Sequence, residues 1–202
     1  MKFIPSNYQI SLEQFGFIKD SSCWFNDSLI LNDEECLSLV EMTNSKRGNL
    51  LYRATRDGFE AQAFHTRCDG KSNTITIIKN NLNYVSGGYS SSAWDSSADY
   101  INDPNAFLFS LRRRNGISCK DKFMTKAHEY SLYGKSDYGP TFGGGHDIFI
   151  CNQSNINNGN YTNFGNSYNL PDGLSYGGNA KEFLAGNFNQ WATIEIEVYQ
   201  II

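Results

Sequence analysis

The sequence predicts an α+β domain built on antiparallel β-sheet, and three observations lead to this fold class. Short apolar runs recur along most of the chain with turn residues between them, which is typical of strands. Their spacing is too tight for the crossover helices that a parallel sheet requires. Two helical patterns come early, before most of the strands, so helices and sheet are expected to segregate.

Two amphipathic helices are expected in the first third of the chain. The first spans 33–43, where Asn32 can accept from the free N–H groups of the first turn and Glu35 holds the reciprocal capping-box position. Its apolar residues indicate a helix packed on a sheet. The second helix follows Asp57, which repeats this capping pattern. Its inward positions, at helical spacing, are Ala61, Phe64 and Cys68.

The strands differ in how many of their faces are apolar. Residues 74–77 alternate polar and apolar side chains, so one face is expected in a core and the other in solvent. Residues 106–111 are apolar on both faces and predict a central strand covered on both sides. The last strand alternates, with Glu195 and Glu197 expected to face solvent. The expected strands are 49–54, 74–77, 83–89, 106–111, 123–127, 129–133, 148–151 and 191–199.

Residues 152–169 are expected to form a long loop. Eight of these 18 residues are Asn, and the segment has no apolar period. Its aromatic residues Tyr161, Phe164 and Tyr168 are expected to fix the loop to the sheet.

Composition limits the class of protein. At 202 residues and 40% hydrophobic content the chain can form one domain, predicted as 28–202 after an N-terminal extension of 1–27. No apolar run approaches the length of a membrane helix, so no membrane insertion is expected. The net charge of −4 argues against nucleic-acid binding. Five widely spaced cysteines, with no recognisable secretion signal, predict reduced thiols and a cytoplasmic location.

The triple glycine Gly143, Gly144 and Gly145 is the first candidate ligand site. A phosphate-binding loop would place a lysine and a helix N-terminus directly after the glycines. Here His146, Asp147 and a buried strand follow, so backbone geometry explains the glycines better.

Few residues suggest catalysis. His146 and Asp147 could form half of a triad, but no nucleophile elbow accompanies them. His65 and Cys68 share a helix face without a second ligand pair, so neither a metal nor a cofactor is expected. Cys119, beside two lysines, is the best candidate for redox chemistry, although nothing pairs it with another cysteine.

One basic cluster could contact a partner with an acidic surface. Three arginines follow one another where a strand is expected to end, a position at which such side chains usually lie in solvent. They are Arg112, Arg113 and Arg114.

Seven segments, in order, carry a resemblance to a known family. They are LLYRATRDGFEAQAFHTRCDG (50–70), TITIIK (74–79), SGGYSSSAWD (86–95), NAFLFSLR (105–112), YGPTFGGGHDIFI (138–150), FLAG (183–186) and IEIEVYQ (194–200). Over about residues 28 to 200 the chain resembles the TLDc domain of eukaryotic oxidation-resistance proteins.

The resemblance implies both a fold and a role. The fold is two antiparallel sheets packed face to face with helices at the flank. The role is protection against oxidative stress, with binding to the peripheral, ATP-hydrolysing sector of the vacuolar-type proton pump. No catalytic residue or cofactor is implied. The residues of the family signature, expected to be mostly structural, are Gly87, Gly88, Trp94, Gly143, Gly144, Gly145, His146, Asp147, Gly186 and Glu197.

Three hypotheses for function follow. The first is a non-catalytic protein-interaction domain, acting as a monomer in the cytosol on a larger assembly such as the proton pump. The second is a small hydrolase or thiol-dependent peroxide scavenger using His146, Asp147 or Cys119. The third is a carbohydrate-binding sandwich, suggested by Trp94, Trp191 and the Asn-rich loop. It requires exposed indoles, whereas we expect both to be buried.

Overall fold

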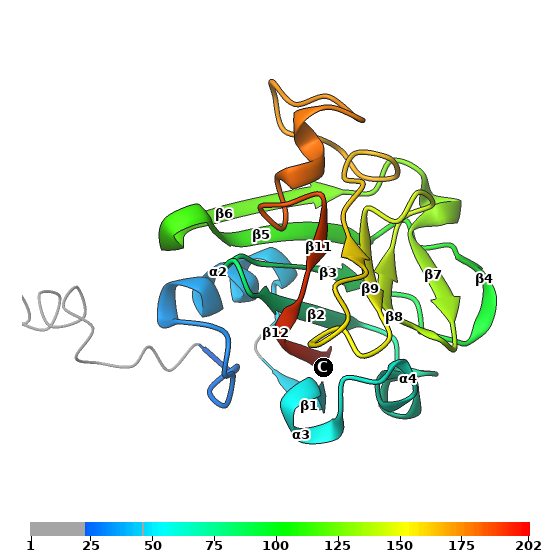
Figure 1. Cartoon of the computed structure of the whole chain (residues 1–202). Coiled ribbons are helices and arrows are strands. Elements are labelled where there is room, and N and C mark those ends of the chain that lie inside the picture. Colours follow the sequence, from blue (N-terminus) through cyan, green and yellow to red (C-terminus); the bar gives the residue numbers. More distant parts are fainter. Residues whose placement is uncertain (1–22, 46) are drawn as a thin grey trace, which may run out of the picture.

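A computed structural model of the chain describes residues 23–45 and 47–202, and shows two six-stranded antiparallel sheets packed face to face (Figure 1). This confirms the α+β sandwich. Sheet I contains, in spatial order, β1 (Gly48–Arg53), β12 (Thr193–Ile201), β2 (Thr74–Asn80), β3 (Val85–Ser90), β5 (Phe107–Arg113) and β6 (Ile117–Met124). Sheet II contains β11 (Asn189–Trp191), β10 (Asn160–Tyr161), β9 (Ile148–Cys151), β8 (Tyr138–Phe142), β7 (Leu132–Lys135) and β4 (Ser97–Ile101).

The helices lie at the flanks of the sandwich. Helix α2 (Asp33–Thr43) covers the face of sheet I that is turned away from sheet II, and α4 (Ala61–Cys68) packs on β1 and β8 at one end of the sandwich (Figure 1). The short elements are α3 (Ala54–Asp57), η1 (Arg114–Gly116), η2 (His128–Tyr130) and η3 (Asn179–Glu182).

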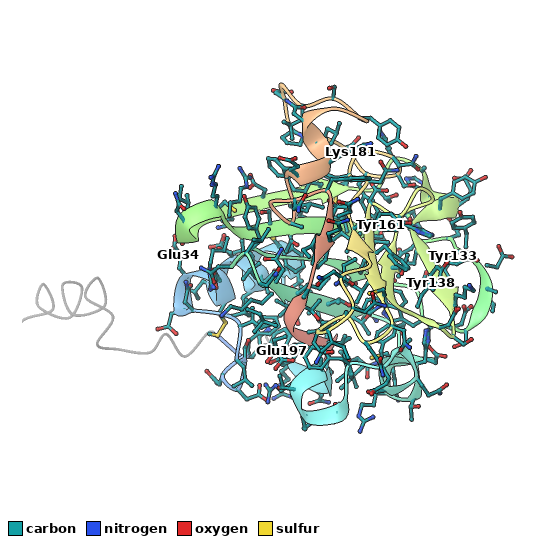
Figure 2. The ribbon with its side chains drawn as sticks, in the orientation of Figure 1. Glu34, Tyr133, Tyr138, Tyr161, Lys181 and Glu197 are labelled. Carbon is teal, nitrogen blue, oxygen red and sulfur yellow. A yellow bond between two sulfur atoms is a disulfide. The ribbon has the colours of Figure 1, made fainter. Side chains whose placement is uncertain are left out.

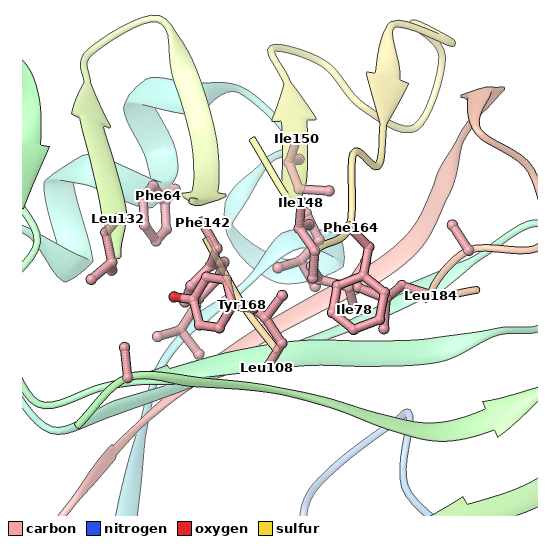
Figure 3. Packing of buried hydrophobic residues seen from close by; sticks show 14 of the residues in the cluster. Phe64, Ile78, Leu108, Leu132, Phe142, Ile148, Ile150, Phe164, Tyr168 and Leu184 are labelled. Atoms are coloured by element: carbon pink, nitrogen blue, oxygen red, sulfur yellow. The ribbon is translucent and has the colours of Figure 1, made fainter. Parts of the chain in front are cut away.

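One hydrophobic core fills the space between the sheets. Leu108 and Ile78 of sheet I face Phe142, Ile148 and Ile150 of sheet II (Figure 3). The Asn-rich loop also contributes to this core, because its aromatic residues Phe164 and Tyr168 are fully buried there, as expected. Tyr161 is different: it belongs to strand β10 and is half-buried.

Two glycines allow the sheets to approach closely. Gly87 and Gly88 lie within strand β3. A Cβ on Gly88 would lie 2.6 Å from the Phe142 ring across the core, and one on Gly87 would lie 1.9 Å from the Thr76 carbonyl oxygen. The glycines are therefore explained by packing and not by a turn.

A second core covers the outer face of sheet I. Ile75 and Phe109 pack against Leu39 of α2 and against Phe25 of the preceding segment. Strand β2 is consequently buried on both faces, which corrects the expectation that one face meets solvent. The doubly covered strand expected at 106–111 is confirmed by β5.

The first helix forms as predicted, and the start of the second differs. In α2 the Glu35 N–H donates to Oδ1 of Asn32 at 2.8 Å, and the Asn32 N–H donates to Oε2 of Glu35 at 3.0 Å, which is a complete capping box. Helix α4 has no side-chain cap. Asp57 instead accepts from the Arg53 N–H and from Arg56, which explains why it does not cap α4.

The expected strand at 129–133 is only partly present. Residues 128–130 form a 3₁₀ turn, and β7 begins at 132. Strands β4 and β8 were not expected from the sequence. Strand β8 contains a glycine and a proline, which are unusual in strands. Strand β4 is a solvent-exposed edge strand, so it lacks an apolar face, and Ala98 within it has a φ of 61°.

Two cysteines form a disulfide, which corrects the prediction that all five are reduced. The fold brings the Cα atoms of Cys23 and Cys36 to 5.9 Å, within the range that a disulfide spans. The free cysteines are Cys68, Cys119 and Cys151. Within residues 23–45 and 47–202, no helix has the length and apolar character to cross a membrane.

Candidate functional site

The triple-glycine segment after β8 is shaped by a buried carboxylate. Asp147 is fully buried and accepts from the N–H groups of Gly165, Asn166 and Ser167 at 2.8, 3.0 and 2.9 Å. Its carboxyl group therefore organises the Asn-rich loop. A Cβ on Gly143, whose φ is 91°, would lie 2.0 Å from Oδ2 of Asp147, so this position requires glycine.

Gly144 and Gly145, the next two residues of this segment, are also closely packed. A Cβ on Gly144 would lie 2.9 Å from the Cβ of Tyr130, and one on Gly145 would lie 2.7 Å from the Asn166 side chain. The glycines thus admit close approach of two loops, as the sequence suggested.

His146 and Asp147 do not form a catalytic pair, because His146 hydrogen-bonds elsewhere. Its Nδ1 lies 2.5 Å from the Tyr161 hydroxyl. Burial lowers the pKa of His146 and raises the pKa of Asp147 to about 6. The backbone N–H groups that donate to Asp147 oppose this rise. The two side chains serve different parts of the fold, and this geometry gives no support to a hydrolase.

Both tryptophans suggested for sugar binding are buried, as expected. Trp94 is 1% exposed, donates from Nε1 to the Thr74 hydroxyl at 2.9 Å and packs edge-on against Phe142. Trp191 is 2% exposed. Neither indole can act as a stacking platform for a sugar, which removes the observation that suggested carbohydrate binding through them.

The two glutamates of β12 are buried, which corrects the expectation that they face solvent. Glu197 accepts from Nε of Arg53 at 3.0 Å and from the Ser28 hydroxyl at 2.6 Å. Glu195 accepts from the Thr55 N–H at 3.1 Å. The physical reason is that α3 and residues 27–29 cover this face of β12, a layer that strand periodicity does not reveal.

The three arginines separate in space. Arg112 forms a paired contact with the buried Glu35 carboxylate, at 2.7 Å from Nε and 2.6 Å from Nη2. Arg113 contacts Asp121 and lies over the Phe183 ring, 3.9 Å from its centroid. Only Arg114 is exposed. Two of the three arginines therefore have internal partners.

Arg114 lies beside Gly186, the last glycine of the family signature. It shares an open cavity of about 440 Å³ with Gly186, whose φ of 76° and closeness to the Tyr84 ring require glycine.

Cys119 lacks the features of an activated thiol. It lies half-buried in β6, with Sγ 3.4 Å from the Ser110 hydroxyl, and burial raises its pKa. A redox-active thiol needs a lowered pKa. Cys68 is fully buried, and burial raises its pKa as well.

His65 has internal partners, so it is not placed as a metal ligand. Its Nδ1 lies 2.7 Å from Oδ1 of Asp69, and its Nε2 lies 2.8 Å from the Lys135 carbonyl oxygen. Among the residues that the structure describes, no group of three His, Cys, Asp or Glu side chains could hold a metal ion.

The most distinctive surface lies on the outer face of sheet II, which none of the helices in residues 23–45 and 47–202 covers (Figure 1). Seven aromatic rings form a continuous series of contacts there, and we call this set the aromatic strip. Tyr133, Tyr138 and Tyr161, labelled in Figure 2, come from three different strands. The strip consists of Tyr100, Tyr130, Tyr133, Tyr138, His146, Phe149 and Tyr161.

The rings of the strip follow one another across the strands. Ring centroids are 5.0 Å apart for Tyr100 and Tyr133, 4.7 Å for Tyr138 and Phe149, and 4.9 Å for Phe149 and Tyr161. Tyr100 and Tyr133 are directly opposed in the β4–β7 pairing. The strip lies across the strands because neighbouring strands place outward-facing aromatic residues side by side.

A comparison with protein families decides the identity of the chain. The profile of the TLDc domain matches residues 24–202. The chain belongs to the TLDc family. A search of curated proteins finds no match.

This TLDc domain has an open pocket at the end of the aromatic strip. Its volume is about 440 Å³, and it combines two aromatic side chains with amide side chains of the Asn-rich loop and β11. The lining residues are Asn158, Gly159, Tyr161, Phe188, Asn189 and Gln190.

The chemistry of the strip in this TLDc domain suits binding. Five of its rings are tyrosines that carry a hydroxyl group, and His146 offers its ring nitrogens. Burial keeps the Tyr161 hydroxyl protonated by raising its pKa. Such rings bury apolar area and still offer hydrogen bonds at their rims. Sequence inspection missed the strip, and only the tyrosine content of 12 residues hinted at it.

Proposed function

We propose that this TLDc domain is a non-catalytic protein-binding module and that a partner docks on the aromatic strip. One observation carries the proposal: seven aromatic rings lie on the sheet face that no helix of the described part of the chain covers, whereas the opposite outer face, on sheet I, is covered by α2. Tyrosine anchors are enriched among the residues that contribute most of the binding energy in protein interfaces. Five of the seven rings are half-buried and all contact neighbouring rings, so binding orders few side chains.

The proposed partner is the peripheral, ATP-hydrolysing sector of the vacuolar-type proton pump, which the family resemblance suggests. The proposed setting is the cytoplasm, with the domain acting as a monomer in protection against oxidative stress. The net charge of −4 supports a protein partner over a nucleic acid. The separation of the three arginines leaves the aromatic strip as the better docking surface.

Binding of the purified peripheral sector to the immobilised full chain tests the proposal. We expect Tyr138→Ala and Tyr161→Ala to weaken binding by 10-fold or more, on the order of 1.4 kcal/mol or above for each anchor. The matched control is Tyr89→Ala, since Tyr89 is a half-buried tyrosine that stacks on Phe107 in sheet I.

Two results would count against the proposal in different ways. Binding that is equal in Tyr138→Ala and in the wild type would refute the strip as the docking surface. Binding of no pump subunit by the wild type would refute the partner, and a screen of stress-protection assays with the same variants would then test whether the strip matters at all.

A further inference from the structure

Residues 23–31 form a strap across the outer face of sheet I. The rings of Trp24 and Phe25 stack at 3.7 Å, and Phe25 packs edge-on against Tyr199 of β12 with centroids 4.9 Å apart. Trp24 also sits directly over Gly48, where an added Cβ would lie 2.2 Å from the indole. Phe25 is 2% exposed, so the strap is part of the second core.

The other half of the strap covers a buried ion pair. The Ser28 hydroxyl and the Leu29 N–H donate to the Glu197 carboxylate at 2.6 and 2.9 Å. Arg53 binds the same carboxylate at 3.0 Å and also contacts Asp27. Glu197 is fully buried and takes two of its hydrogen bonds from the strap, so release of the strap would open this pair to water.

A disulfide links the start of the strap to helix α2. Cys23 is half-buried and Cys36 is 2% exposed. A cavity of about 120 Å³ borders both cysteines, along with Phe25, Ser28, Leu31 and Asp33. Cys23 is therefore the more exposed of the two cysteines, and there is open space beside the bond.

We propose that Cys23–Cys36 is a thiol-exchange site and that its reduction releases the strap from Tyr199 and Glu197. The reductant is a low-molecular-weight thiol such as glutathione. Its thiolate attacks Sγ of Cys23, the bond to Cys36 breaks, and Cys36 leaves as a thiolate that takes up a proton. A second thiol then attacks the mixed disulfide on Cys23. Two thiols are oxidised to one small-molecule disulfide, and the protein gains two thiols.

The expected consequence follows from the short loop that the bond closes. Cys23 and Cys36 are 13 positions apart and both lie outside the strands, so the disulfide restricts chiefly the strap. Removing such a cross-link raises the population of the released state on the order of 100-fold. The remaining strap contacts are the rings of Trp24 and Phe25, the buried Ile30 side chain, the ion pair of Asp27 with Arg53 and a few hydrogen bonds. We expect these contacts to keep the reduced strap in equilibrium between bound and released states.

The experiment equilibrates the full chain with glutathione buffers of defined ratio. Cysteine alkylation and mass spectrometry then report the state of each thiol, and hydrogen exchange reports the strap. We expect reduction with the mixed disulfide on Cys23, together with a rise in exchange on the order of 100-fold at residues 24–31 and little change in β5. Cys23→Ser should show the fast exchange without glutathione, and Cys119→Ser, which removes a free half-buried thiol, should behave as wild type.

Three results would overturn the inference: a disulfide that resists glutathione while the protein stays folded, a mixed disulfide on Cys36 in place of Cys23, or reduction with unchanged exchange at 24–31. If Cys23→Ser fails to fold, the reduced wild-type chain still provides the exchange measurement. None of these results bears on partner binding at the aromatic strip, which is assayed separately.

Discussion

The Tyr161 hydroxyl lies 2.5 Å from Nδ1 of His146, and this contact joins strand β10 to the triple-glycine segment. Burial raises the pKa of Tyr161 and lowers that of His146, so both groups are neutral near pH 7. We expect the hydroxyl to donate to Nδ1, which leaves the proton of His146 on Nε2. Nitrogen chemical shifts of the imidazole report this tautomer directly. Tyr161→Phe should abolish the preference and lower stability by about 1 kcal/mol. A proton on Nδ1 in the wild type would contradict the assignment.

Gly88 and Phe142 set the spacing of the sheets, because a Cβ at residue 88 would lie 2.6 Å from the ring. We expect Gly88→Ala to reduce the free energy of unfolding by about 2 kcal/mol through overpacking. Chemical denaturation measures it. Gly159→Ala is the control: its Cβ would lie 3.2 Å from the flexible Asn157 side chain and in ordinary contact with the Cys151 side chain, at 3.4 Å, so a change within about 0.5 kcal/mol is expected.

A smaller side chain at residue 142 should partly rescue Gly88→Ala. In Gly88→Ala with Phe142→Leu the loss should be less than the sum of the two single losses, since the contact is shared. Simple additivity would show that the strain at residue 88 does not come from Phe142.

Arg112 is predicted to be a stability residue. Arg112→Ala leaves the Glu35 carboxylate, 1% exposed, without its cation, and we expect a loss of about 3 kcal/mol. Arg114→Ala removes an exposed arginine from the same run and should change stability by less than about 0.5 kcal/mol. Thermal denaturation of both variants distinguishes a structural arginine from a surface one. Equal losses of stability in the two variants would contradict the structural role of Arg112.

Asp147 should make stability depend on pH. Burial raises its pKa from 3.8 to about 6, so the folded state holds a proton that the unfolded state has released. The contribution is therefore fully present below pH 3.8 and is lost as the pH rises through about 6. The shift corresponds to about 3 kcal/mol. Unfolding free energies between pH 3.5 and 7 should fall more in wild type than in Asp147→Asn. Parallel curves would mean that the backbone donors cancel the effect of burial.

Local patterns predicted much of the fold. The Asn32 and Glu35 box starts α2 where the sequence places it, and 148–151 forms a strand because its apolar run has few alternatives. Contacts between distant residues could not be predicted. Arg112 and Glu35 are 77 positions apart, and no local signal connects them.

The aromatic strip was missed for the same reason. Tyr100 and Tyr133 become neighbours only through the β4–β7 pairing, and β4 itself has no strand pattern. Along the chain these tyrosines look like isolated surface residues. The buried Glu195 and Glu197 show the converse: strand alternation gives the face of a side chain but not whether another layer covers that face.

The two outer faces of the sandwich are separated by the whole core, with the strap on sheet I and the aromatic strip on sheet II. No hydrogen bond or ring contact links residues 23–31 to the strip among the described residues. A chemical change on one face and a macromolecule on the other thus share no side chain. We expect the free energies of the two events to add. The domain would then respond to the chemical change and to the macromolecule independently, and neither event would alter the equilibrium constant of the other.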